Sequence, residues 1–287
     1  MKLPKPEPQT KLTDAMWDSP RYVAEEKFDG ERCWLDGSRG APRLYSSGNT
    51  DRSLAVPHIV RAHKLLEGAA LDGEIVAPSR RFGDVVSVLH SGPERAHQVQ
   101  IETGFVRFHA FDLMAFEGQD LTHRPLRERR KTLETLVARL RNPALVCVPQ
   151  TAENKREFYR TIVRNGGEGV VLKNLDLMYG LGWVKAKHRA DVSAVISHVH
   201  ADRDAIELSV YDGARLVPIG DCAIPTIELR GQLRATPHRY VGRVLDVSAY
   251  ELTSHDRLRS PVWMRLRPDV FAADCTLRKV REQLGAQ

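Results

Sequence analysis

The pattern of apolar and polar residues predicts a series of short strands over the first two thirds of the chain. Strand-forming residues alternate with polar ones, or form apolar runs bounded by turn residues, at seven places. These places are Arg21–Glu26, Cys33–Asp36, Arg43–Tyr45, Ala70–Ala77, Phe105–Phe116, Val170–Lys173 and Trp183–Lys187. We expect Asp72-Gly73 to interrupt the fourth strand as a turn. We expect Phe105, Phe108 and Phe116 to lie in the core.

Helical spacing appears between these strands. The best predicted helix is Leu126–Arg141, whose apolar residues recur at positions i, i+3, i+4 and i+7. Pro57 is expected to open a second helix that runs to about Leu66. Thr151 is expected to cap a third helix that ends before Gly166.

After about His188 the pattern changes to short strands separated by turn residues, with room for a short helix among them. The strand-like runs are Val192–Val199, Ala205–Tyr211, Leu216–Ala223, Tyr240–Leu252 and Val262–Leu266. Five short strands of this kind favour a small β-barrel such as an OB-fold. The pattern therefore predicts an α+β domain over residues 1–188, followed by an OB-fold barrel over residues 189–287.

Composition narrows the class of protein without fixing it. Of 287 residues, 43 are Lys or Arg and 37 are Asp or Glu, a net charge of +6, and 42% are hydrophobic. These values exclude a mainly disordered, collagen-like or membrane-spanning chain, and they permit a polyanionic partner. The four cysteines are far apart, so neither a zinc ribbon nor a disulfide framework is expected. The absence of a signal peptide and of a long apolar segment predicts a cytoplasmic protein without a membrane partner.

The segment Glu25-Glu26-Lys27-Phe28-Asp29-Gly30-Glu31-Arg32 places a lysine between a strand and a tight turn. One interpretation is a solvated strand end with surface ion pairs. The other is a nucleophilic lysine, which must lose its proton before it attacks, against a reference pKa of about 10.4.

Four later segments favour the second interpretation. They are Leu71-Asp72-Gly73-Glu74, Ala110-Phe111-Asp112-Leu113, Glu168-Gly169-Val170-Val171-Leu172-Lys173 and Trp183-Val184-Lys185-Ala186-Lys187. In order and spacing, the five segments resemble the nucleotidyltransferase motifs of ATP-dependent DNA ligases, and the resemblance covers nearly the whole chain. It implies an adenylylation domain of antiparallel sheets with flanking helices, followed by an OB-fold.

The resemblance also implies how ATP binds. Lys27 matches the lysine that attacks the α-phosphate and becomes lysyl-AMP. Glu25 matches the acceptor of the adenine amino group, although a surface charge is the alternative. Glu74 matches the carboxylate that holds the ribose, and Phe111 matches the aromatic residue that stacks on adenine, although it too could belong to the core.

Four cations are expected at the phosphates. Arg32 matches the arginine that touches the ribose and the nick 5′-phosphate; its alternative is a structural ion pair with Glu31 or Asp36. Lys185 and Lys187 share one face of a strand, and a phosphate is the natural anion to lie between them. For Lys173, a direct phosphate contact and a structural role are equally open.

Glu168 matches the carboxylate that binds Mg²⁺, or Mn²⁺, and Asp29 is either an outer metal group or the turn residue.

The chain departs from the family pattern at two places. Ser46-Ser47 stands where ligases carry a Ser-Arg pair, and Arg52 or Arg43 is expected to compensate. The last motif, Arg-x-Asp-Lys, becomes Arg267-Pro268-Asp269-Val270, so Arg267 is expected to orient pyrophosphate without the usual lysine. Lys279 or Arg278 could reach the same phosphate.

The function expected from these residues is an ATP-dependent DNA ligase that acts as a monomer. It would seal 5′-phosphate/3′-hydroxyl nicks in duplex DNA through lysyl-AMP and adenylylated DNA. The alternatives are an RNA ligase, a capping nucleotidyltransferase that uses GTP, and a nick-binding protein that has lost turnover.

Overall fold

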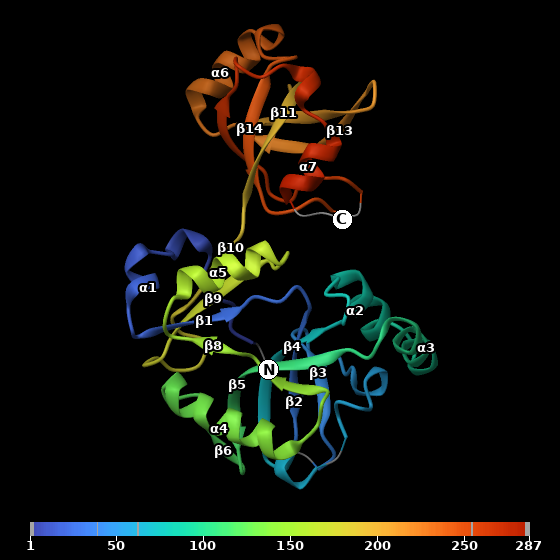
Figure 1. The fold of residues 1–287 in the computed structure, drawn as a ribbon, viewed down its shortest axis with the longest axis vertical. Coiled ribbons are helices and arrows are strands. Elements are labelled where there is room, and N and C mark those ends of the chain that lie inside the picture. Colours follow the sequence, from blue (N-terminus) through green and yellow to red (C-terminus); the bar gives the residue numbers. More distant parts are fainter. Residues whose placement is uncertain (1–2, 39, 62, 254, 285–287) are drawn as a thin grey trace. The chain divides into compact units, whose positions relative to one another are not determined.

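The computed structural model describes residues 3–38, 40–61, 63–253 and 255–284. The chain forms two compact units, Met1–Lys187 and His188–Gln287 (Figure 1). Each unit has its own hydrophobic core, so each is described by itself.

The larger sheet of the first unit has six strands. They are β2 (Glu31–Asp36), β3 (Arg43–Ser46), β4 (Ala70–Val76), β5 (Arg107–Phe116), β6 (Gln119–Asp120) and β7 (Leu145–Cys147). Their order is β3-β2-β4-β5-β6, with β7 parallel to β5 and the other pairs antiparallel. One face of this sheet packs its apolar side chains against helices α2 (Phe82–Leu89), α3 (Pro93–Thr103) and α4 (Leu126–Leu140).

The smaller sheet has four antiparallel strands in the order β10-β9-β1-β8. They are β1 (Tyr22–Glu26), β8 (Gln150–Thr151), β9 (Gly169–Asn174) and β10 (Trp183–Lys187). One face packs against α1 (Asp14–Asp18) and α5 (Lys155–Arg164) through Trp17 and the buried side chains Ala24, Val170, Leu172 and Ala186.

Strand alternation explains how polar residues gather on the other faces of the two sheets. Side chains alternate between the faces of a strand, so Ala24 and Leu172 pack against the helices while their neighbours Glu25 and Lys173 lie on the opposite face. The same alternation places Asp72 and Glu74 of β4 opposite the core-facing Leu71. The site is built on these faces.

The second unit contains a closed barrel with the strand order β11-β12-β13-β15-β14. Its elements are β11 (Ala190–Val199), β12 (Ala205–Asp212), β13 (Arg215–Ala223), α6 (Ile227–Ala235), β14 (Val244–Ala249), β15 (Val262–Leu266) and α7 (Leu277–Leu284). Each of the five strand-like runs in this part of the sequence overlaps one barrel strand. The α+β class predicted for the chain is confirmed.

Four local predictions are wrong. Thr151 lies in β8 and does not cap the following helix, since α5 begins at Lys155 with Asn154 at its N-cap position. The described residues between Pro57 and Leu66 form turns and a 3₁₀ helix, Lys64–Leu66, in place of an α-helix. Strand β4 runs through Asp72 without a turn. The only departure from regular pairing at Asp72-Gly73 is a shift of register against β5. Phe105 is 44% exposed rather than in the core, whereas Phe108 is fully buried.

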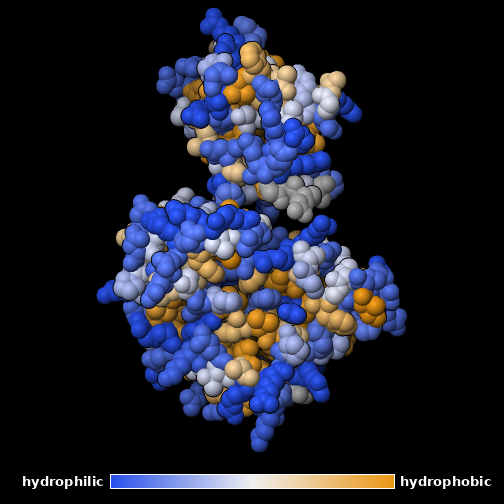
Figure 2. Space-filling model, viewed as in Figure 1, coloured by the Kyte–Doolittle hydropathy of each residue, from blue (hydrophilic) through white to orange (hydrophobic). Residues whose placement is uncertain are grey.

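Helices α2 and α3 were not predicted, since only a short apolar stretch marks the first and the second is largely polar. No helix in the described part of the chain combines the length and apolar character that a membrane crossing requires. On the face shown in Figure 2, the surface of each unit is mostly hydrophilic, with apolar side chains visible between polar ones.

Candidate active site

Lys27 lies at the end of β1 beside a carboxylate from a distant part of the chain. Its backbone N–H donates to the Gly169 carbonyl at 2.9 Å, and its Nζ lies 2.5 Å from Glu168 Oε2. Lys187 forms an ion pair with the other oxygen, Oε1. Burial opposes ionisation of Glu168, but the two ammonium groups hold the pKa of this carboxyl below its usual value. One carboxylate therefore bridges two lysines.

Glycine is required beside Glu168 for this arrangement. Gly169 has φ of +132°, and a Cβ at this position would lie 2.2 Å from the Ala186 carbonyl oxygen. Only glycine lets β9 approach β10 closely enough to bring Glu168 to Lys187.

Lys185 is the third ammonium group of this cluster. Its backbone N–H donates to the Glu7 carbonyl at 3.1 Å, but its partly buried ammonium makes no hydrogen bond or ion pair with the residues that the structure describes. Burial lowers its pKa, and repulsion from Lys27 and Lys187 lowers it further. Three cations around one carboxylate leave a net positive charge, which a phosphate would neutralise.

Glu25 is buried and lies at the centre of a second polar cluster. Its side chain is 3% exposed, its Oε2 lies 2.5 Å from Lys173 Nζ, and its Oε1 accepts from Gln150 Nε2 at 2.5 Å. Arg130 of α4 approaches the same oxygen at 3.5 Å. The alternative of a surface charge is therefore wrong for Glu25, and an adenine amine would have to replace one of these protein donors.

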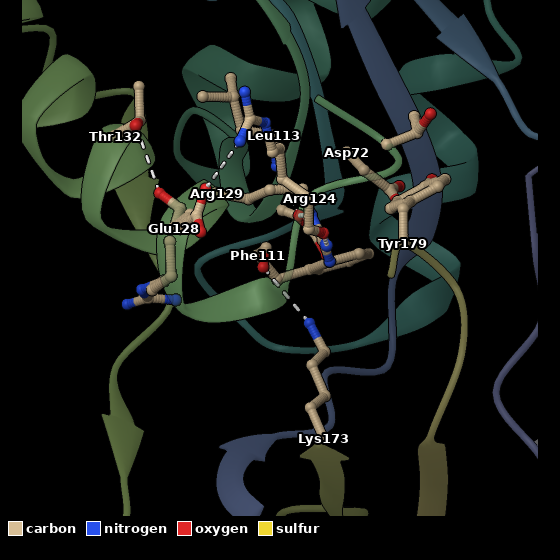
Figure 3. Close-up of polar contacts among 12 residues, drawn as sticks. Asp72, Phe111, Leu113, Arg124, Glu128, Arg129, Thr132, Lys173 and Tyr179 are labelled. Carbon is tan, nitrogen blue, oxygen red and sulfur yellow. Dashed lines mark hydrogen bonds and ion pairs between the residues drawn. The ribbon is translucent and has the colours of Figure 1, made fainter. Parts of the chain in front are cut away.

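Phe111 lies beside Lys173, whose ammonium is 4.4 Å from the ring centres of both Phe111 and Trp183. The same ammonium donates to the Phe111 carbonyl at 3.3 Å, as the dashed line in Figure 3 shows. The next residue, Asp112, is fully buried and accepts two hydrogen bonds from Arg129 at 2.7 and 2.8 Å. These contacts fix the strand that carries Phe111. They also give Lys173 structural contacts with a carboxylate and two aromatic rings.

Arg32 pairs with Asp72, not with Glu31 or Asp36. Its guanidinium donates to both carboxylate oxygens at 3.0 and 2.5 Å, and the Tyr179 hydroxyl donates to the same carboxylate at 2.7 Å. Burial raises the pKa of Asp72, although these donors oppose the shift. The turn role expected for Asp72 is therefore wrong, because this residue anchors Arg32 from inside β4.

Glu74 lies opposite Arg32 in the pairing of β2 and β4. Burial raises its pKa to about 8, although the nearby cations Lys27 and Arg32 oppose the shift. A carboxyl in this state is protonated at neutral pH unless a ligand adds a donor or a cation.

This shift predicts a pH-dependent stability. The unfolded chain releases the Glu74 proton near pH 4.5 and the folded chain near pH 8. The unfolded state thus binds fewer protons between these values, and stability falls as pH rises through the window. We expect Glu74→Gln to remove this loss, which amounts to about 1.4 kcal/mol for each pH unit.

Urea denaturation of wild type and variant at several pH values checks the expectation. An exposed charge removed elsewhere, Glu67→Gln, serves as the control. If the free energy of unfolding depends on pH in the same way for Glu74→Gln and wild type, the expectation is wrong.

The residues expected to bind a metal are only partly together. Glu168 lies in the lysine cluster, and Asp29 lies in the bend between β1 and β2. Among the described residues, no group of three or more His, Cys, Asp or Glu side chains could hold a metal ion. Mg²⁺ characteristically takes one or two protein carboxylates with phosphate oxygens and water in its other positions. The single carboxylate of Glu168 fits a metal that arrives with a phosphate ligand.

The two departures from the family pattern have different surroundings. Ser46 is buried at the end of β3, where its Oγ accepts from the Thr50 N–H at 3.1 Å. Arg52 lies 3.5 Å from Glu31, whereas Arg43 forms an exposed pair with Asp51. Arg52 is therefore the better placed of the two, since Glu31 precedes Arg32 on β2.

In the second unit, Arg267 donates to Asp269 at 2.9 and 2.8 Å and to Asp246 at 2.9 Å. Val270 packs against the core of the barrel. Lys279 lines the same small hollow as Arg267 and Val270, with a volume of about 210 Å³. Arg278 instead pairs with Glu282 on α7. Lys279 is therefore the better candidate for the missing lysine.

The sequence of residues 7–189 matches the family model described as the ATP dependent DNA ligase domain. The match covers more than half of the chain, and this chain therefore belongs to that family.

Relatives with curated names agree. The chain is 29% identical over 195 residues to a DNA ligase of Methanocorpusculum labreanum, a match over 64% of this chain and 35% of the relative. It is 30% identical over 214 residues to a probable DNA ligase of Streptomyces coelicolor, a match over 67% of this chain and 41% of the relative. The chain thus spans only about a third of the length of the first such relatives.

Solved structures share the fold. A chain described as Pmar-Lig_PreS3 has a TM-score of 0.67 at 18% identity, over 86% of this chain and 63% of that one. A structure from work on Lig E DNA ligases has a TM-score of 0.63 at 20% identity, over 93% and 99%. The ligase domain of M. tuberculosis LigD has a TM-score of 0.53 at 24% identity, over 96% and 97%.

Proposed function

We propose that this chain is an ATP-dependent DNA ligase that seals nicks in duplex DNA. The observation that carries the proposal is the cluster of Lys27, Lys185 and Lys187 around the single carboxylate Glu168. This arrangement supplies a nucleophile, an adjacent carboxylate and an excess of positive charge at one point. Family membership supports ATP as the substrate and DNA rather than RNA as the acceptor.

In the first proposed step, Lys27 Nζ attacks the α-phosphorus of ATP. A P–N bond forms, the bond to the β-phosphate oxygen breaks, and pyrophosphate leaves. Glu168, 2.5 Å away, pairs with the Lys27 ammonium and orients it, and the proton that the amine loses passes to water. Lys185 and Lys187 stabilise the negative charge that develops on the phosphate oxygens. A bound Mg²⁺ would neutralise phosphate charge at Glu168.

Two further transfers complete the reaction. An oxygen of the nick 5′-phosphate attacks the phosphorus of lysyl-AMP, and the P–N bond breaks to restore the lysine. The 3′-hydroxyl then attacks the adenylylated 5′-phosphate, AMP leaves, and a phosphodiester remains. In-line positioning of the reacting groups supplies much of the rate.

The binding of ATP follows from the second cluster. We assign the adenine to Phe111 and Glu25, with Lys173 holding both residues in place, and the ribose to Glu74. We assign residues 1–188 to the nucleotidyltransferase domain and residues 189–287 to an OB-fold whose Arg267 orients pyrophosphate. A monomeric state and a cytoplasmic location stay predictions.

One assay tests the proposal. Incubation with labelled ATP and magnesium should give a covalent AMP adduct that stays on the protein in denaturing electrophoresis, and a 5′-phosphorylated nick in duplex DNA should then be sealed. Labelling by GTP instead of ATP would favour a capping nucleotidyltransferase. Sealing of single-stranded RNA but not nicked DNA would favour an RNA ligase, and nick binding without any adduct would favour a protein that has lost turnover.

Lys185 provides a sharper test of the phosphate cluster. Because its ammonium has no carboxylate partner among the described residues, Lys185→Ala should leave the free energy of unfolding within about 1 kcal/mol of wild type. AMP transfer should fall by about a hundredfold, because a cation aimed at the developing charge is lost. Single-turnover labelling and urea denaturation measure the two effects, and Lys185→Arg is the control that keeps the charge. Unchanged AMP transfer would contradict the assigned role.

A further inference from the structure

A large hollow of the first unit is lined by neither Lys27 nor the other residues of the lysine cluster, and it has no role in the proposed reaction. Its volume is about 840 Å³, within the range of ligand sites. The residues that line it come from the segment after β3, the start of β5 and the loop between α4 and β7. Those with polar or aromatic side chains that matter here are His58, Arg61, His63, Phe105, Arg107 and Arg141.

The charge of this hollow has one sign. Three arginines line it, and none of the described lining residues is an Asp or Glu. The guanidinium groups of Arg61, Arg107 and Arg141 make no hydrogen bond or ion pair with any residue that the structure describes, although the backbone of Arg107 is paired within the sheet. Elsewhere in the chain, arginines such as Arg32 and Arg267 are held by carboxylates. Three unpaired guanidinium groups at one site favour an anion with several phosphates.

The hollow also offers an aromatic surface and a free acceptor. Phe105 is 44% exposed and has its ring held by edge contacts with His58 and His97, at centroid distances of 5.1 and 6.1 Å. His58 Nε2 faces the Val106 carbonyl at 2.9 Å, so this nitrogen carries the proton. His58 Nδ1 is then a buried acceptor, and it has no partner among the described residues. An exposed aromatic ring and an acceptor suit a nucleobase.

The walls of the hollow are fixed by hydrogen bonds. Asn142 Nδ2 donates to the His58 carbonyl at 3.1 Å, and the Phe108 N–H donates to the Ala144 carbonyl at 2.8 Å. These bonds join the three segments that form the hollow, so the site exists before a ligand binds.

Strand β5 connects the hollow to the proposed active site. Arg107 and His109 alternate with the core-facing Phe108, so both lie on the face that carries the site. The His109 ring packs against Phe28, the residue after Lys27, at 4.5 Å between centroids. Arg107 is four residues from Phe111, about 13 Å along the strand. That length equals about four stacked nucleotides.

We propose that this hollow binds single-stranded DNA, with phosphates at Arg107 and Arg141 and a base on Phe105. The identification of the strand as DNA rests on the proposed function. An unpaired DNA tail that leaves the nick along β5 would reach the arginines and Phe105 of this hollow.

Fluorescence anisotropy of a labelled oligothymidylate tests the proposal. The double variant Arg107→Gln/Arg141→Gln should weaken binding at least tenfold and reduce the dependence of log Kd on log salt by about 1.4, the value for two lost phosphate contacts. Phe105→Leu should weaken binding by about fivefold to more than a hundredfold through lost stacking. The matched control is Arg95→Gln/Arg215→Gln, which removes the same charge from exposed residues outside the hollow.

Three results would overturn the proposal. They are equal weakening by the control pair, displacement of the oligonucleotide by AMP at comparable concentration, and tighter binding of the RNA of corresponding sequence. AMP transfer to Lys27 by the same variants is measured separately. It should stay at the wild-type rate, and its absence in wild type would count against the proposed function alone.

Discussion

Replacing Lys27 with arginine is expected to abolish the transfer of AMP from ATP to the protein, with a loss of more than about a thousandfold. The guanidinium keeps a positive charge beside Glu168, so it preserves the electrostatics of the pair that joins residues 27 and 168. It remains protonated at any accessible pH and offers no free electron pair to phosphorus. The variant therefore separates nucleophilicity from charge.

The measurement is covalent labelling by ATP, detected by denaturing electrophoresis after a single turnover, on protein whose folding is checked by circular dichroism. Lys64→Ala removes an exposed lysine of the same unit and should label like wild type. Retention of the adduct in Lys27→Arg would mean that another residue is the nucleophile.

Replacing Asp72 with alanine is expected to cost about 3–5 kcal/mol in the free energy of unfolding. Asp72 is fully buried and accepts from Arg32 twice and from Tyr179 once. Its removal leaves the mostly buried Arg32 guanidinium without its carboxylate, and the penalty of an unpaired charge exceeds the value of the contact itself. The change should also release Arg32 from its fixed position.

Chemical denaturation followed by tryptophan fluorescence measures this cost, because three of the four tryptophans, Trp17, Trp34 and Trp183, lie in the first unit. The matched control is Asp51→Ala, which breaks an exposed aspartate–arginine pair of 2.7 Å. Surface pairs contribute at most about 1 kcal/mol. If Asp72→Ala lowers the free energy of unfolding no more than Asp51→Ala does, burial of the ion pair does not determine its contribution to stability.

Most strands could be predicted because each carries its own local pattern. The run Val262–Leu266 coincides with β15, and Trp183–Lys187 coincides with β10. The helix expected at Leu126–Arg141 is α4, which ends one residue earlier at Leu140. The failures occur where long-range contacts outweigh local preference. The pair Asp72-Gly73 is typical of a turn, yet β4 is paired with β2 on one side and with β5 on the other, and this pairing keeps Asp72 extended.

The candidate site could be predicted as a set of residues but not as a set of contacts. Motif order indicated Lys27, Glu168 and Lys187, and the structure places the three together. Motif order could not indicate that Gln150 and Arg130 contact Glu25, since both residues come from segments without a motif. The available signal in the sequence was the position of Arg130, four residues after Leu126 and three before Leu133, on the apolar face of the predicted helix.

Consecutive arginines of α4 reach both sheets of the first unit. Arg129 is bound to Asp112 on β5, and Arg130 approaches Glu25 on β1. An opening of α4 would break both contacts at once, so the helix and the two strands belong to one cooperative unit of local unfolding. A nucleotide held between Glu25 and the strand of Phe111 would then slow amide hydrogen exchange in α4, a helix for which no nucleotide contact is proposed.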